Sequence, residues 1–154
     1  MNYCRNHLDE QIVDLALGVL ERRLRRLRPT TPFETPEAAA TYLQLKLADR
    51  EREIVAVLLL NNKHRLIEYR ELFHGTVDGS SLYPREVVKA ALAANAAGVI
   101  LAHNHPSGDP EPSQADKDAT DRLKRALALI DVRLLDHLVI GHECWISMSR
   151  NGYL

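Results

Sequence analysis

The chain has 154 residues, of which 45% are hydrophobic and 27% charged, a composition that fits one globular domain and excludes a disordered chain. Its net charge of −1 at pH 7 gives no global attraction to nucleic acid, and no apolar run approaches the roughly 18 residues that span a membrane. The two cysteines, Cys4 and Cys144, show no CxxC spacing, and the N-terminus lacks the apolar stretch of a signal peptide, so we expect a cytoplasmic protein.

The first predicted element is a helix over residues 8–28, where aliphatic side chains recur at helical spacing. Cations favour a helix C-terminus, which explains part of the arginine cluster within Arg22–Arg28. The remaining arginines of this cluster form either a solvated helix face or a contact with DNA or an acidic partner. Pro29–Pro32 breaks the helix. We therefore expect a helical arm over residues 1–28, which either docks on the core or mediates a homodimer, and a domain over residues 33–154.

The domain is predicted to begin with a helix and a hairpin. Thr35 and Pro36 are typical of a helix start, and this helix is expected to run through Leu47. The unbroken aliphatic run Ile54–Leu60 is too short for an isolated helix and indicates a central strand. A turn at Asn61–Lys63 and a second strand over His64–Leu72 complete the hairpin. A loop follows, with Gly75, Asp78, Gly79 and Ser80.

The second half alternates helices and strands. The pattern predicts a helix from Pro84 to about Asn95, and the apolar run Gly98–Ala102 indicates a buried strand. A helix over residues 115–130 and strands over residues 132–140 and 144–149 follow, with Cys144 expected to be a core thiol. The sequence therefore predicts an α/β fold, a mixed sheet flanked by helices, with a short helix at its N-terminus.

The most informative pattern lies between His103 and Asp116. Residues two apart on a strand point to one face, so His103 and His105 should project together. Residues 106–112 are rich in proline and glycine and predict a loop, after which Ser113 begins a helix with Asp116 in its first turn. Two histidines and one aspartate would give zinc three protein ligands and leave a fourth position for water. Ser113 and Asp116 also fit a plain helix cap, and the same ligands accept other divalent ions.

These residues resemble the His-x-His-x7-Ser-x2-Asp motif of JAMM (MPN/JAB) metallopeptidases of the RadC type. Leu72–Thr76, Tyr83–Val87 and Leu135–Val139 are similar to further RadC segments, so the resemblance covers roughly residues 33–154. It implies the JAB/MPN (cytidine-deaminase-like) architecture and one Zn²⁺ per chain. It also implies that metal-activated water hydrolyses an amide bond in a peptide or protein substrate. Asn104 stands where eukaryotic JAMM enzymes usually carry Ser or Thr, and this difference is usual for the RadC type.

The resemblance also implies a general base on an upstream strand. In JAMM enzymes this residue is a glutamate, and the matching region here is Asp49–Ile54. We assign the role to Glu53, the last acid before the strand, with Glu51 as the alternative; both also fit exposed charges. Ser113 is expected to donate its hydroxyl to the developing oxyanion, an interaction that contributes about 3 kcal/mol to catalysis.

Two nearby residues and two further functions stay open. His137 either forms a structural pair with Asp136 or orients a metal ligand, and Thr120 is expected to bond only to its own helix backbone. RadC-type proteins have been labelled DNA-repair factors, and a weak DNA contact through Arg22–Arg28 would be steeply salt-dependent. Longer RadC proteins carry an N-terminal helix-hairpin-helix region where this chain has one short helix. The complete ligand set argues against a metal-free interaction module.

Overall fold

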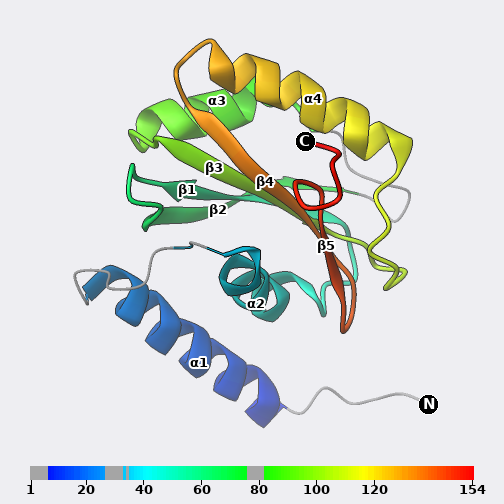
Figure 1. Cartoon of the computed structure of the whole chain (residues 1–154). Coiled ribbons are helices and arrows are strands. Elements are labelled where there is room, and N and C mark those ends of the chain that lie inside the picture. Colours follow the sequence, from blue (N-terminus) through cyan, green and yellow to red (C-terminus); the bar gives the residue numbers. More distant parts are fainter. Residues whose placement is uncertain (1–6, 27–32, 34, 76–81) are drawn as a thin grey trace.

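A five-stranded sheet with helices on both faces organises the chain (Figure 1). The computed structural model describes residues 7–26, 33, 35–75 and 82–154, with the backbone alone for residues 7–10 and 23–26. Its elements are α1 (His7–Arg26), α2 (Pro36–Leu47), β1 (Ile54–Leu60), β2 (Leu66–His74), α3 (Pro84–Ala93), β3 (Gly98–Asn104), α4 (Gln114–Ala128), β4 (Arg133–Ile140) and β5 (Trp145–Ser147). The predicted α/β class, with a mixed sheet flanked by helices, is confirmed.

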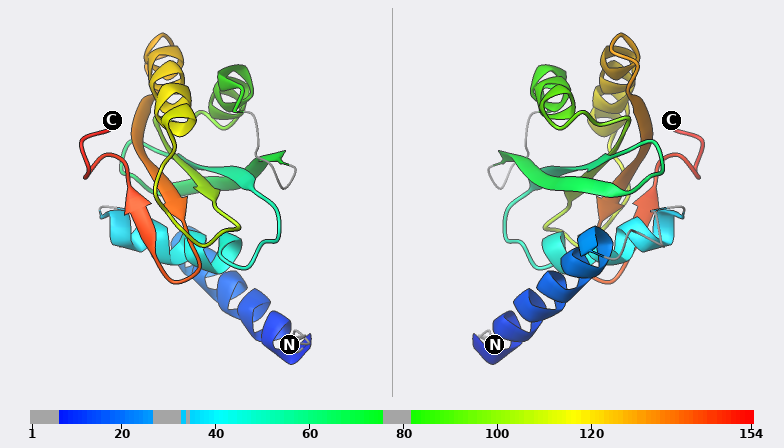
Figure 2. Two further views of the ribbon diagram at one scale, coloured as in Figure 1. Left: turned by 90° about the vertical axis from the view of Figure 1, so that its right-hand side faces the viewer. Right: turned by 90° about the vertical axis from the view of Figure 1, so that its left-hand side faces the viewer.

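The strands lie in the order β2-β1-β3-β4-β5. Strands β3 and β4 are parallel and are joined through α4, whereas every other pair is antiparallel. Every residue of β1 and β3 is buried, as expected for strands that are covered on both faces. Helices α1 and α2 lie on one side of the sheet, and α3 and α4 lie on the other (Figure 2). Strand β3 is therefore the central strand of the sheet, with helices on both of its faces.

The alternation of side chains along the strands divides the core into two parts. On one face, Val55, Val57 and Leu101 pack with residues of α3 and α4, such as Val87 and Leu123. On the opposite face, Ile54, Ala56, Leu58 and Leu60 pack against α2. His103 is two residues beyond Leu101 on β3 and therefore faces the α3 and α4 side. Asn104 faces the α2 side.

Helix α1 contacts the domain along one side only. Leu17 is buried in the core next to α2, and the Glu21 carboxylate accepts a hydrogen bond from the Tyr42 hydroxyl at 2.9 Å. On its other side, Ile12, Leu15 and Val19 are exposed. The homodimer, one of the two alternatives that the sequence leaves open for this helix, and the division of the chain at residues 28 and 33 stay predictions. Among the described helices, none is long and apolar enough to cross a membrane.

Several sequence expectations differ from the structure in detail. Strand β2 begins at Leu66 rather than His64, because His64 has a φ of 55° and belongs to the turn. Strand β5 covers only Trp145–Ser147, and Cys144 just before it is exposed, so the prediction of a core thiol was wrong. The end of the first predicted helix (residues 27–28), the linker (residues 29–32) and the loop residues 78–80 lie outside the described residues.

Candidate metal centre

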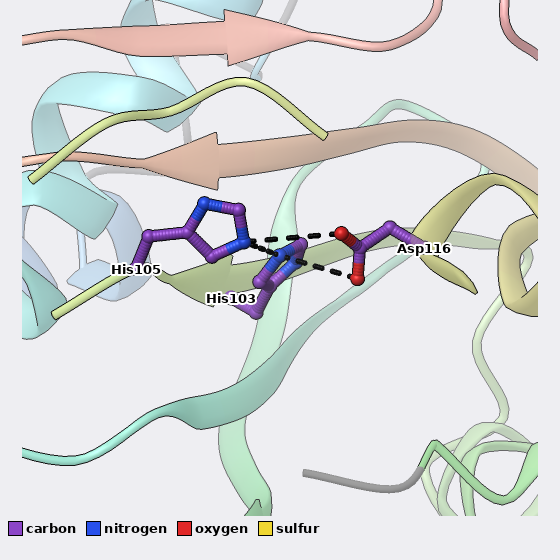
Figure 3. A group of neighbouring side chains, drawn as sticks. All are labelled: His103, His105 and Asp116. Carbon is purple, nitrogen blue, oxygen red and sulfur yellow. Dashed lines mark hydrogen bonds and ion pairs between the residues drawn. The ribbon is translucent and has the colours of Figure 1, made fainter. Parts of the chain in front are cut away.

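His103 and His105 come from the end of the central strand β3, as the motif predicts. His103 pairs with Val55 of β1 on one side and with Val139 of β4 on the other, which fixes its position in the sheet. His105 follows the strand by one residue, and its N–H donates to the carbonyl of Ile140 at 2.9 Å. The two Nε2 atoms lie 2.9 Å apart (Figure 3).

Asp116 reaches the histidines from the first turn of α4, and Ser113 fixes its carboxylate. The Ser113 N–H and hydroxyl both donate to Asp116 Oδ2, at 2.8 and 2.6 Å, while the Asp116 N–H donates to Ser113 Oγ at 3.2 Å. This reciprocal cap uses Oδ2 and leaves Oδ1, which lies 3.5 Å from His103 Nε2 (Figure 3). The helix cap and the ligand arrangement are therefore both present.

The three side chains fit a divalent metal ion. One donor atom from each of His103, His105 and Asp116 can be chosen so that all lie within 4.8 Å of one another. Tetrahedral zinc with bonds of about 2.0–2.1 Å places its ligand atoms about 3.3 Å apart. The separations of 2.9 and 3.5 Å from His103 Nε2 lie on either side of this value, and His105 Nε2 lies 3.8 Å from Asp116 Oδ2. His103, His105 and Asp116 could therefore hold a metal ion.

His105 is held by the backbone of the loop that follows it. Its Nδ1 lies 2.7 Å from the main-chain oxygen of Asp109, and a carbonyl oxygen can only accept a hydrogen bond. Nδ1 therefore donates a proton to this oxygen, which leaves Nε2 as the ring nitrogen available to a metal ion. About 20% of the His105 side chain is exposed, so this ligand forms the outer side of the centre.

His103 is 2% exposed and contacts other side chains. Its Nδ1 lies 2.8 Å from Nε2 of His137, and Nδ1 of His137 lies 2.6 Å from the Thr120 hydroxyl. Burial lowers the pKa of His103 to about 4, although Asp116 acts in the opposite direction, and burial also holds the pKa of His137 well below its ordinary value. Both rings are therefore neutral at pH 7.

Asp136 and His137 are paired through the main chain only, because the His137 N–H donates to Asp136 Oδ1 at 2.7 Å. Their side chains point to opposite faces of β4, as those of successive strand residues do. The Asp136 carboxylate accepts hydrogen bonds from the Ser147 hydroxyl at 2.6 Å and from the Ser149 N–H at 3.0 Å. The ring of His137 instead contacts His103, one of the three residues that could hold a metal ion. Orientation of a metal ligand was the alternative interpretation of the sequence. Thr120 bonds to its helix backbone, as expected, and to His137 as well.

A pocket of about 490 Å³ opens beside the ligands. Its walls include Glu53, His103 and Asp116, together with apolar residues from β1, β3, α3 and α4. Glu51 is exposed and is not among the lining residues, so the structure brings only the preferred glutamate to the pocket. Ser113 is also exposed and outside the lining, and it contacts the site through Asp116. The catalytic roles of Glu53 and Ser113 stay predictions.

Asn104, between the two histidines, holds the segment that carries Glu53. Its side chain is buried on the α2 side of β3, where Oδ1 accepts from the Ile54 N–H at 2.8 Å. Its Nδ2 donates to the carbonyls of Arg50 and Arg52, at 3.3 and 3.1 Å. Sequence reasoning missed this role, although an amide alternating with two ligands on a strand must face away from the metal and needs its own partners.

The basic end of α1 is described only in part. Arg22 donates from Nε to the carbonyl of Gly18 in its own helix at 3.1 Å. The side chains of the remaining arginines, up to Arg28, lie outside the described residues. The DNA contact that the sequence leaves open therefore stays a prediction.

Comparison with known proteins gives a consistent result. The family described as RadC-like JAB domain matches residues 33–153 of the chain. A UPF0758 protein of Vibrio cholerae serotype O1 is 53% identical over 146 residues, which cover 95% of this chain and 90% of the relative. A UPF0758 protein of Aeromonas hydrophila is 50% identical over 145 residues, which cover 94% of this chain but 63% of that longer relative.

Proposed function

Because this chain belongs to the RadC-like JAB domain family, we propose that it is a zinc-dependent hydrolase of peptide or isopeptide amide bonds. The mixed sheet flanked by helices is consistent with the JAB/MPN fold. The observation that carries the proposal is that Glu53 lines the same pocket as the ligands His103 and Asp116. An acid beside a metal site in an open pocket is the arrangement that metal-assisted hydrolysis requires.

Each ligand has a defined donor atom. The metal would be held by Nε2 of His103, Nε2 of His105 and Oδ1 of Asp116, because the other polar atoms of these side chains have hydrogen-bond partners. When bound, zinc supplies a Lewis acid that lowers the pKa of water to about 7. Ser113 keeps Asp116 in position through its N–H and hydroxyl.

The proton transfers are assigned to Glu53. Its carboxylate would take a proton from the attacking water and deliver it to the nitrogen of the leaving amine. The hydroxyl of Ser113 would turn from Asp116 toward the substrate and donate to its carbonyl oxygen as that oxygen gains negative charge. The apolar part of the pocket wall would exclude water from around the reacting amide.

Metal content is the first test. The purified wild-type chain should contain about one zinc, and the His103→Ala/His105→Ala double variant should contain none. The matched control is His142→Ala, which removes an exposed histidine that is not among the three candidate ligands. A wild-type protein that binds no divalent metal would contradict the proposal.

Hydrolysis is the second test, measured by mass spectrometry on a library of peptides derived from a bacterial proteome. Zinc-loaded wild type should generate new peptide termini. Glu53→Gln should retain zinc and lose at least 100-fold in rate, because it removes the general base. Glu51→Gln is the matched control and should keep the wild-type rate. Full activity in a zinc-loaded Glu53→Gln protein would refute the role of Glu53.

A further inference from the structure

We infer that His137 and Thr120 are positioning residues that hold the metal ligand His103 in one tautomer, with its proton on Nδ1 and its Nε2 lone pair in the metal site. They do so through a one-way chain of hydrogen bonds that ends on the main-chain carbonyl of Asp116. The inference rests on the metal binding of the proposed function, and it is independent of the hydrolysis.

The direction of the chain follows from its last member. The carbonyl oxygen of Asp116 can only accept, and the Thr120 hydroxyl donates its single proton to it at 2.6 Å. His137 Nδ1, 2.6 Å from the same hydroxyl, must then donate to Thr120 Oγ1. The ring of His137 is buried between an imidazole and a hydroxyl, where an unpaired cation would be costly, so it carries one proton. Its Nε2 therefore accepts, and His103 Nδ1 donates to it at 2.8 Å.

The reverse direction leaves one contact without a proton. If His137 Nε2 donated to His103, His137 Nδ1 would be an acceptor and would need the proton of the Thr120 hydroxyl. The hydroxyl would then have none for Asp116, and two oxygen lone pairs would face each other at 2.6 Å. The exposed fractions of His103, Thr120 and His137 are 2%, 1% and 2%, so water has little access to repair such a contact.

The chain also couples two of the three metal ligands. Asp116 contributes its carboxylate to the metal site and its carbonyl to the far end of the chain, while His103 lies at the near end. The members come from three elements, with His103 on β3, His137 on β4 and Thr120 on α4. The side chain of His103 on the sheet and that of Asp116 on the helix are therefore held in fixed relative positions before a metal binds. Hydrogen bonds of this kind orient metal-bound histidines in general.

The affinity for Zn²⁺, measured by competition with a chromophoric chelator, tests this role with matched pairs. Thr120→Val keeps the shape of the side chain and removes the hydroxyl, and His137→Leu removes the acceptor for His103. Each should weaken zinc binding about 10- to 100-fold, the usual effect of losing such a partner. Thr120→Ser restores the hydroxyl, and His137→Gln offers an amide oxygen and an N–H in place of the two ring nitrogens. Both should stay within about threefold of wild type.

The tautomer itself is the readout that a merely structural role would not move. In ¹⁵N-labelled protein treated with chelator, the ring nitrogens of His103 should show a protonated Nδ1 and an unprotonated Nε2. The Thr120→Val variant should show a mixture of both tautomers, and Thr120→Ser should match wild type. A proton on Nε2 in wild type, or unchanged tautomer and affinity in Thr120→Val, overturns the inference. Because this spectrum is recorded without metal, it decides the inference even if the wild type shows no hydrolysis.

Discussion

The two candidate histidine ligands lie two residues apart, yet they are held by different parts of the molecule. His103 is 2% exposed, and side chains from β4 and α4 hold its ring. His105 is about 20% exposed, and the main-chain oxygen of Asp109 in the following loop holds its ring. The inner half of the centre is thus built from buried side chains, and the outer half from the path of a loop.

The difference determines which changes each half tolerates. A buried hydrogen bond between side chains is lost when either residue is replaced, and the remaining partner is left unpaired away from water. A hydrogen bond to a main-chain carbonyl survives every side-chain replacement that keeps the backbone in place. Residues of the inner half should therefore be sensitive to side-chain chemistry, whereas the outer half should be sensitive to backbone geometry.

The largest effect is expected for Asn104→Ala, which removes a buried side chain on the opposite face of β3 from His103. The variant loses the bonds to the Ile54 N–H and to the carbonyls of Arg50 and Arg52, and should lower the free energy of unfolding by roughly 3–5 kcal/mol in urea denaturation. Because the ligands are untouched, zinc content should stay near one per chain, while hydrolysis falls as the Glu53 segment moves.

Asn61→Ala is the control for this experiment. Its amide oxygen accepts from the N–H groups of Lys63 and Arg65 in the more exposed hairpin turn, so its removal should cost only about 1 kcal/mol. Equal losses in the two variants would show that Asn104 is no more than an ordinary turn amide.

The pH dependence of the chelator-treated protein probes His103 directly. Its pKa falls from 6.5 to about 4 on folding, because burial disfavours the charged ring. Below pH 6.5 the unfolded chain therefore binds the proton more readily than the folded chain does. Above pH 6.5 the ring is neutral in both states, and the buried position of His103 does not reduce the free energy of unfolding. As the pH falls from 6.5 toward 4, the free energy of unfolding decreases by about 3 kcal/mol. The lowered pKa of His137 acts in the same direction.

Urea denaturation at pH 7 and pH 4 in the presence of chelator measures this loss. His103→Gln removes the titrating ring and should lose distinctly less stability between the two pH values than wild type does. The prediction fails if the two proteins lose the same amount.

The sequence was sufficient for the features that depend on local spacing. His103 and His105 follow from strand alternation, and Asp116 follows from the loop length and the helix start. Strand Ile54–Leu60 was predicted with the bounds that the structure has, because an unbroken aliphatic run has few other solutions in a small domain.

The remaining features depend on how distant segments pair. The contact of His137 with His103 is set by the register between β3 and β4, which contains an irregularity between Val99 and Ile100. No local pattern specifies that register. Cys144 was misplaced for a related reason, because strand alternation was extended over a residue that precedes β5 and belongs to the turn.

Gly141→Ala tests the outer half through its backbone. A Cβ at Gly141 would collide with the main-chain oxygen of Gly108, in the loop that positions Asp109, and would lie 2.9 Å from Cys144 Sγ. The backbone at Gly108 or Gly141 must shift to relieve this contact. We therefore expect the free energy of unfolding to fall by about 1–3 kcal/mol and zinc to bind more weakly. The tautomer of His103 should not change. Gly18→Ala, where a Cβ meets nothing within 4 Å, is the control and should be neutral or stabilising.

The smallest effect is expected for Asp109→Ala, which separates the carbonyl of Asp109 from its side chain. The carboxylate accepts a hydrogen bond from the Glu111 N–H at 3.0 Å, but the contact with His105 Nδ1 is made by the main-chain oxygen. The variant keeps that oxygen, so zinc affinity in the chelator competition should change by less than about 0.5 kcal/mol. A tenfold weaker affinity would mean that the carboxylate maintains the loop path, and that the outer ligand depends on side-chain chemistry as much as the inner one does.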